Sequence, residues 1–247
     1  MGVSWIYQYP VAESKGPQVL NELEKYLELL GGEKIGTYSV DTEPFIPQPG
    51  ASSVGPLKTI HLCHNTDFPA SSFALLGDET KACLHLTADV MLDQLMQKFQ
   101  PGYASRPNAK TELNGQKFQF TDFVVKAGAV SAAASFKGLL VEVEYEACSH
   151  PMLCAELMKE FCQSILGSVA QGPPEYIADR MSRLSSRWEY KPVDTMCQYL
   201  DHFLIFRKGN APPPFPGPGP PQAQMINPQQ GPPLPGNTLY QGMPMQR

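Results

Sequence analysis

The sequence lacks several features that would indicate a membrane protein or a common class of enzyme. No apolar run reaches the roughly 18 residues that a membrane-spanning helix needs. No G-x-S-x-G elbow, G-x-G-x-x-G turn or phosphate-cradling loop occurs. No C-x-x-C pair is present either, so neither a zinc ribbon nor a dithiol redox motif is predicted. These absences direct attention away from cofactor chemistry.

The chain also has little positive charge. It carries 19 Lys and Arg against 24 Asp and Glu, a net charge of −5, and the basic residues are scattered along its length. A protein that binds nucleic acid directly is expected to gather basic residues into a patch, so direct binding is not predicted. The six cysteines follow no secretory signal pattern, and we expect them to be reduced, buried thiols.

The composition changes abruptly near Lys208. Residues 209–247 hold 12 of the 25 prolines and one charged side chain, Arg247. Such a segment cannot bury enough apolar surface to fold, so we expect a disordered Pro/Gln/Gly-rich tail. We therefore predict one globular domain over residues 1–208. That length supports a core without disulfides or metals.

The hydrophobic periodicity of residues 1–208 predicts a mixture of strands and helices, hence an α+β protein. Two capping residues, Thr87 and Asp194, are expected to begin helices. The first of these helices is predicted to bury Met91, Leu92, Leu95, Met96 and Phe99. Strands are expected at 3–9, 34–41, 57–64 and 82–86, with two more between 113 and 148, and helices at 18–30, 87–99, 151–166 and 194–206. Residues 42–56 and 172–192 are expected to be irregular.

The two strand-like stretches from Leu113 to Cys148 contain the strongest turn signal and the strongest catalytic signal. Asn114-Gly115 is typical of a type I′ hairpin turn. Further on, Glu142, Glu144 and Glu146 alternate with apolar residues, which places three carboxylates on one face of a strand. Two interpretations follow, a solvated acidic face or a set of ligands for a divalent metal.

As metal ligands, these three glutamates would resemble half of a tunnel-type triphosphatase site. A complete site of that kind needs a second paired-carboxylate strand and an interior lined with Lys and Arg. No second Glu-x-Glu lies on an expected strand, so the solvated face is the favoured interpretation. A metal-dependent triphosphatase that uses Glu142, Glu144 and Glu146 remains the alternative function.

A second possible metal site lies at His61, Cys63 and His64. His61 and Cys63 would share one face of the expected strand at 57–64, as the beginning of a zinc site would require. The other cysteines and histidines offer no second pair at a matching spacing. We therefore expect ordinary strand positions here, and no metal or cofactor is predicted anywhere in the chain.

Several blocks of the sequence resemble the Mediator subunit 20 family. The blocks are MGVSWIYQYPVAE at the start, EKIGTYSVD after the first helix, the stretch from Leu113 to Cys148, and DTMCQYLDHF near residue 200. They occur in family order over most of residues 1–208. The resemblance implies a barrel-like or strongly curved antiparallel sheet with flanking helices.

The same resemblance implies a non-enzymatic scaffold subunit of the Mediator head module in the nucleus. Such a subunit would be a transcription coactivator that bridges regulators and RNA polymerase II, and it would pair with Mediator subunit 18. It would contact the polymerase machinery indirectly, and neither nucleic acid nor membrane directly. Aromatic residues are enriched at interfaces, which makes six of them candidates for partner contacts. They are Trp5, Tyr7, Tyr9, Tyr199, Phe203 and Phe206.

Overall fold

The computed structural model describes residues 2–12, 15–49, 57–77, 84–99, 102–184 and 188–208. The predicted tail over 209–247 lies outside these ranges, so the predicted division of the chain at residue 208 stays a prediction. In the described part of the chain, no helix combines the length and apolarity needed to cross a membrane.

Strands of the described residues form one antiparallel sheet. Its order is β1 (Val3–Tyr9), β9 (Ser135–Tyr145), β8 (Phe123–Ala132), β7 (Thr111–Phe120), β2 (Glu33–Pro47), β3 (Ile60–Asn65), β4 (Ser71–Leu76) and β5 (Leu84–Asp89). A short β6 (Tyr103–Ser105) pairs with the end of β2. The strands β1 and β5 end this order without pairing with each other, so the sheet is open between them.

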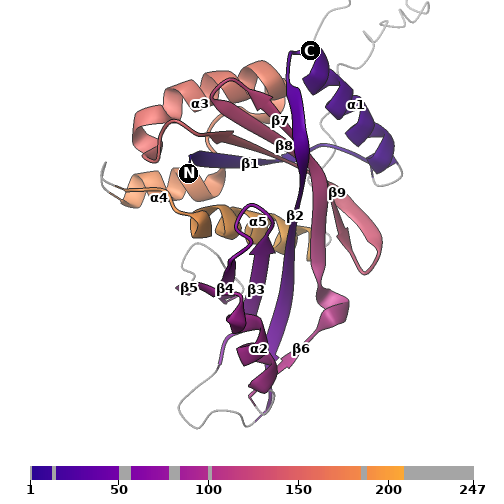
Figure 1. The fold of residues 1–247 in the computed structure, drawn as a ribbon, viewed down its shortest axis with the longest axis vertical. Helices are drawn as coiled ribbons and strands as arrows, with labels where there is room; N and C mark the ends of the chain where they lie inside the picture. The colour runs from indigo at the N-terminus through magenta and orange to yellow at the C-terminus, as the bar shows by residue number, and fades with distance from the viewer. Residues whose placement is uncertain are drawn as a thin grey trace, which may run out of the picture. The chain divides into compact units, whose positions relative to one another are not determined.

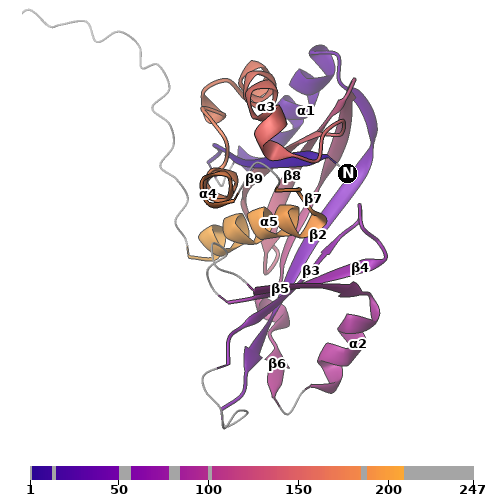
Figure 2. The same ribbon diagram turned by 90° about the vertical axis from the view of Figure 1, so that its left-hand side faces the viewer.

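Helices cover the sheet from several sides (Figure 1). Their bounds are α1 Gly16–Leu29, α2 Met91–Lys98, α3 Pro151–Leu166, α4 Glu175–Arg183 and α5 Pro192–Arg207, with short 3₁₀ turns η3 Pro107–Ala109 and η4 Gly167–Val169. The helix α1 packs on β7, β8 and β9, whereas α5 contacts both β1 and β4. Figure 2 shows α5 between β1 and the strands β3 to β5. The predicted α+β fold with a curved antiparallel sheet and flanking helices is confirmed.

Two elements have the bounds that the sequence predicts. The strand β1 spans Val3–Tyr9, and α3 spans Pro151–Leu166. Pro151 stands in the first turn of α3, where its missing N–H costs nothing, and Gly167 follows the helix with a φ of 58°. Proline and glycine set both ends of this helix locally, so no tertiary contact is needed to place them.

The predicted hairpin turn at Asn114-Gly115 is wrong. Both residues lie inside β7, and the chain turns at Thr121-Asp122, since Phe120 pairs with Phe123. Glycine is required at 115 for a different reason. A Cβ there would lie 2.1 Å from the carbonyl oxygen of Ala127 on β8. The glycine therefore permits a close approach of strands and does not mark a turn.

The helix predicted from Thr87 also begins later than expected. Thr87 belongs to β5, where it pairs with Phe73, and α2 begins at Met91. The carboxylate of Asp89 accepts the Met91 N–H at 2.6 Å and so caps the first turn. Of the residues expected to be buried, Met96 is buried while Met91, Leu95 and Phe99 are about half exposed.

Two regions expected to be irregular contain regular structure. The strand β2 continues from the predicted end at residue 41 to Pro47, because β3 and β6 both pair with this part of it. Residues 175–183 form α4, whose Tyr176 and Ile177 are buried in the core. Strand pairing and core packing therefore give both segments regular structure, although local turn signals predict irregular structure there.

Candidate functional site

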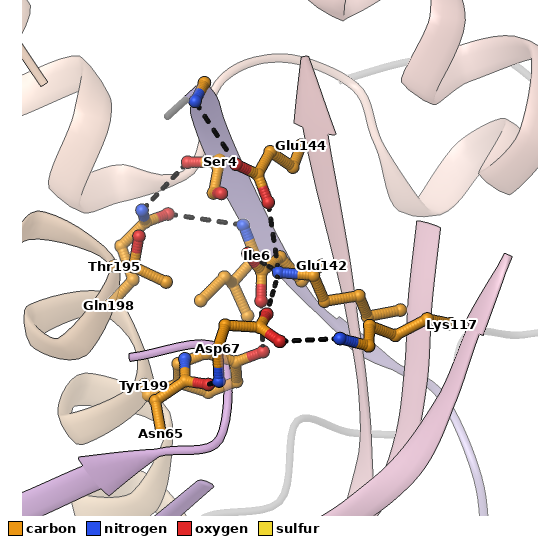
Figure 3. Close-up of polar contacts among 12 residues, drawn as sticks. Ser4, Ile6, Asn65, Asp67, Lys117, Glu142, Glu144, Thr195, Gln198 and Tyr199 are labelled. Carbon is orange, nitrogen blue, oxygen red and sulfur yellow. Dashed lines mark hydrogen bonds and ion pairs between the residues drawn. The ribbon is translucent and has the colours of Figure 1, made fainter. Parts of the chain in front are cut away.

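A cluster of charged side chains is buried beneath α5. Lys126 on β8 is 3% exposed, and its Nζ lies 3.0 Å from Glu142, 3.1 Å from Glu144 and 2.7 Å from Asp67. Lys117 on β7 reaches the other oxygen of Asp67 at 2.7 Å. Figure 3 shows Asp67, Lys117 and Glu142 converging from the sheet and the β3–β4 turn. We call these five residues the charged cluster.

A tyrosine of α5 completes the charged cluster. The hydroxyl of Tyr199 donates to the Glu142 carboxylate, which is only 1% exposed (Figure 3). Burial raises the pKa of Tyr199, and the nearby Glu142 charge raises it further. Burial opposes the charge on Lys126, yet the surrounding carboxylates hold the pKa of its amine well above the ordinary value. Lys126 is therefore a permanent cation at the centre.

In the charged cluster every carboxylate is paired with an ammonium group, and one formal negative charge is left over. Three carboxylates face two ammonium groups, and Lys126 occupies the space between the carboxylates where a divalent cation would have to lie. Within the described ranges, no group of three or more His, Cys, Asp or Glu side chains is arranged to hold a metal. The arrangement is that of a structural ion-pair network rather than a metal-binding tunnel.

The favoured interpretation of the three glutamates as a solvated face is wrong for Glu142 and correct only at the end of the strand. Residues 138–143 of β9 are all buried, because the sheet is covered on both faces there. Glu144 retains a partly exposed side chain. Glu146 lies beyond the strand, where it is exposed and accepts a hydrogen bond from Gln119. The alternation indicated the shared face correctly but not its burial, because α5 returns from residue 192 to cover it.

The candidate zinc residues do not form a site. His61 and Cys63 are buried on β3, and the Cys63 thiol donates to the Thr42 hydroxyl at 3.3 Å. His64 points elsewhere, with Nδ1 2.8 Å from Asp41 and Nε2 3.0 Å from Asp93 of α2. The hydrogen bond to Asp41 is the main cause that raises the pKa of His64 to about 9, and Asp93 adds to it. His64 thus links β2 to α2 as a cation.

The six aromatic residues predicted to contact a partner belong to the domain's own core or its margin. Trp5 and Tyr199 are fully buried, Tyr7, Phe203 and Phe206 are nearly so, and Tyr9 is half-buried against the core. Tyr7 donates a hydrogen bond to the carbonyl oxygen of Gly172 at 2.8 Å. Their burial explains the aromatic enrichment by packing. Partner contacts through these residues stay a prediction.

One edge of the sheet is capped by side chains of α5. Gln198 accepts the Ile6 N–H at 3.2 Å and donates to the Ser4 carbonyl at 2.9 Å, as a neighbouring strand would (Figure 3). His202 donates from Nε2 to the Ile6 carbonyl at 3.2 Å. Burial lowers the pKa of His202 to about 4, so its imidazole is neutral at pH 7. We call β1 the capped edge.

The other edge of the sheet carries an apolar surface, and the helix residues that belong to it were predicted to be buried. A groove of about 460 Å³ lies between β5 and α2, lined mainly by Leu86, Ala88, Met91, Leu92 and Leu95. Leu84 is 70% exposed and Leu86 is 52% exposed. The signal was present in the sequence as a short apolar stripe, but periodicity does not tell whether a stripe meets its own chain or another one.

Comparison with known proteins gives one consistent result. Residues 1–204 match the family model described as TATA-binding related factor (TRF) of subunit 20 of Mediator complex. The protein named Mediator of RNA polymerase II transcription subunit 20 from Anopheles gambiae is 41% identical over 213 residues, covering 84% of this chain and 95% of that protein. The protein of the same name from Mus musculus is 40% identical with the same coverage.

Among solved structures, a chain of the Schizosaccharomyces pombe Mediator head module is 16% identical, with a TM-score of 0.37. The match covers 68% of this chain and 94% of that one. This likeness is too low to support a conclusion, which rests instead on the family model and on the sequence identities. On those grounds, the chain belongs to the Mediator subunit 20 family.

Proposed function

We propose that this protein is a scaffold subunit of the Mediator head module that acts in the nucleus as a transcription coactivator. The observation that carries the proposal is the match of residues 1–204 to the subunit 20 family. The structure is in keeping with it, because the most conspicuous group of titratable residues is a network of ion pairs in which Lys126 lies between the carboxylates. The role is assembly, through binding free energy between apolar surfaces.

The finer proposal is a pair with Mediator subunit 18, with contacts to RNA polymerase II made through the rest of the complex. The pairing follows from the family resemblance. Its physical support is the exposed apolar surface at β5 and α2, which a complex subunit is expected to cover with another chain. The net charge of −5 favours protein contacts over direct contacts with DNA.

Affinity purification of the tagged full chain from nuclear extract, followed by quantitative mass spectrometry, tests both levels. We expect Mediator head subunits at moderate salt, with subunit 18 in equal amount. A version that lacks residues 209–247 serves as a matched variant, because assembly through the domain predicts an unchanged set of partners. Recovery of the chain without Mediator subunits would contradict the proposed function.

A metal-dependent triphosphatase is the alternative that the three glutamates raised. Lys126 between the carboxylates argues against it, since a cation is already in place. Triphosphate hydrolysis by the purified protein with Mg²⁺ or Mn²⁺ would distinguish the two functions. We expect no release of phosphate above the level of a Glu142→Gln variant.

A further inference from the structure

Exposed apolar side chains gather beside the open edge of the sheet. They belong to six residues on β5, the turn after it and α2: Leu84, Leu86, Val90, Met91, Leu95 and Phe99. Each of the six is at least 45% exposed. We call these residues the β5–α2 surface. Leu86, Met91 and Leu95 of this surface line the groove between the strand and the helix, together with two charged residues, Asp89 and Lys98.

The helix that forms one wall of the groove is firmly attached. Met96 packs with Phe45 and Leu62 in a small core on the other side of α2. The carboxylate of Asp93 accepts hydrogen bonds from His64 Nε2 at 3.0 Å and from the hydroxyl of Ser72 at 2.9 Å. These contacts hold α2 in place beside β5, so the groove between them is preformed.

The strand that forms the other wall is the last strand of the sheet. In the described part of the chain, β5 pairs with β4 on one side and with no strand on the other. Edge strands that are exposed and apolar pair with further strands unless charge, proline or a covering element prevents it. The strand β5 contains no proline, and its one Asp or Lys-type charge is Asp89, at its end. By contrast, Gln198 and His202 cap the backbone of β1.

We infer that the β5–α2 surface is the docking site for an extended apolar segment of another Mediator subunit, which adds to β5 as a strand and places alternate side chains in the groove. The inference rests on the proposed function, because membership of a complex supplies the second chain. Strand addition would add backbone hydrogen bonds along residues 85–88, while the groove would bind every second side chain of the added segment. Asp89 and Lys98 also line the groove, so the segment is expected to carry a basic and an acidic residue that can pair with them.

The size of the surface agrees with such an interface. The six residues leave exposed the equivalent of about three large side chains, on the order of 500 Å² at about 150 to 250 Å² for each. A stable interface buries about 800 Å² per partner, of which about 60% is apolar. The surface thus provides the apolar area that one stable interface requires.

The chain's own tail is a weaker candidate for this role. Residues 209–247 hold 12 prolines, and proline cannot donate to a strand ladder. A second copy of the chain would pair β5 with β5 across a two-fold axis, which the measurements below distinguish from a different subunit.

The test uses the full chain with two variants of the surface, Leu86→Lys and Leu95→Asp, and two matched controls, Leu153→Asp on α3 and Leu29→Asp on α1. The controls replace leucines that are 76% and 86% exposed. We expect the surface variants to reduce co-purified Mediator head subunits at least about tenfold, and the controls to reduce them less than about twofold. Circular dichroism melts show whether each variant is folded.

Hydrogen exchange in the purified complex tests the mode of binding. Amides of residues 85–88 are expected to exchange more slowly in the complex than in the isolated chain. Equal recovery of subunits by the surface variants and the controls would overturn the inference while leaving the proposed function intact. Failure of the unmodified chain to recover Mediator subunits would overturn both.

Three further outcomes also overturn the inference. Protection of α2 without protection of β5 would indicate a helix in the groove. A dimer of the isolated chain that Leu86→Lys abolishes would indicate a second copy. Faster exchange of residues 85–88 after deletion of 209–247 would indicate that the tail covers the strand.

Discussion

The two edges of the sheet differ in whether the domain's own side chains cover them. At the capped edge, Gln198 and His202 from α5 satisfy the backbone of β1, and every residue from Val3 to Tyr7 is buried. At the open edge, β5 lies next to a groove whose leucines remain exposed. The helix α5 thus closes one edge, and the other edge is left for a contact with another chain. The difference indicates that stability resides on the β1 side and recognition on the β5 side.

The largest expected effect lies in the charged cluster on the β1 side. Lys126→Met would leave Asp67, Glu142 and Glu144 facing one another without their shared cation. We expect the free energy of unfolding to fall by about 3 to 5 kcal/mol, the usual result of removing one partner of a buried ion pair. Urea denaturation of the folded domain measures it.

Lys117→Met is the matched control for Lys126→Met. Its side chain is 24% exposed, and among the described residues its ion pair is with Asp67, which keeps Lys126 as a second partner. We therefore expect a loss of about 1 kcal/mol or less. Adding Glu142→Gln to Lys126→Met should restore part of the lost stability, since it removes one unpaired charge. Equal losses for Lys117→Met and Lys126→Met would refute the assignment of Lys126 as the centre of the cluster.

The histidines of the two regions are expected to respond to pH in opposite directions. His202 has a pKa of about 4 in the folded protein and about 6.5 when unfolded. Between these two pH values the unfolded state therefore binds more protons than the folded state. The stability that neutral His202 contributes is present above about pH 6.5 and is lost as the pH falls towards 4, by up to about 3 kcal/mol. Thermal unfolding across pH 4 to 7, with His202→Gln as comparison, measures this contribution.

His64 has its pKa raised to about 9. The stability that charged His64 contributes to the folded protein is fully present below about pH 6.5 and is lost as the pH rises through 9. We expect a smaller effect than at His202, because a third of the side chain is exposed and salt screens the pair. A His64→Gln variant whose stability keeps the same dependence on pH between 7 and 10 as the unmodified protein would exclude this role.

Removing the cap from β1 is expected to have an intermediate effect. Gln198→Leu would leave the Ile6 N–H and the Ser4 carbonyl buried without partners. Each unsatisfied buried group costs about 1 to 3 kcal/mol. Urea denaturation should show this loss, and hydrogen exchange at Ile6 should become faster.

The exposed residue Gln163 provides the control for Gln198. Gln163→Leu removes only a hydrogen bond to the Gln171 carbonyl at the surface. We expect a change within about 0.5 kcal/mol. If both glutamine variants lost the same stability, the capping of β1 by Gln198 would not be supported.

The smallest expected effect on stability lies at the open edge. Leu86→Lys removes an exposed apolar side chain, so the free energy of unfolding should change by less than about 0.5 kcal/mol. Lysine at an exposed edge strand also opposes unwanted pairing, and the variant should be at least as soluble as the original. A loss above 2 kcal/mol would show that β5 belongs to the core and would remove the contrast between the edges.

The boundaries of β1 and α3 and the mixed fold class were determined by the sequence itself. Local chemistry is sufficient there, since Pro151 and Gly167 place the ends of α3 and alternation places β1. The pairing of Glu142 and Glu144 on one face was determined in the same way. These features depend on residues that are neighbours along the chain.

Tertiary structure alone decided whether those faces are buried and what they contact. The turn at Thr121-Asp122, the burial of Glu142 beneath Tyr199 and the capping of Ile6 by Gln198 join residues far apart in sequence. The same holds for the apolar stripe from Met91 to Phe99, which looks identical in sequence whether it covers a core or remains exposed. Burial depends on which distant segment returns to cover a surface, and no local pattern contains that information.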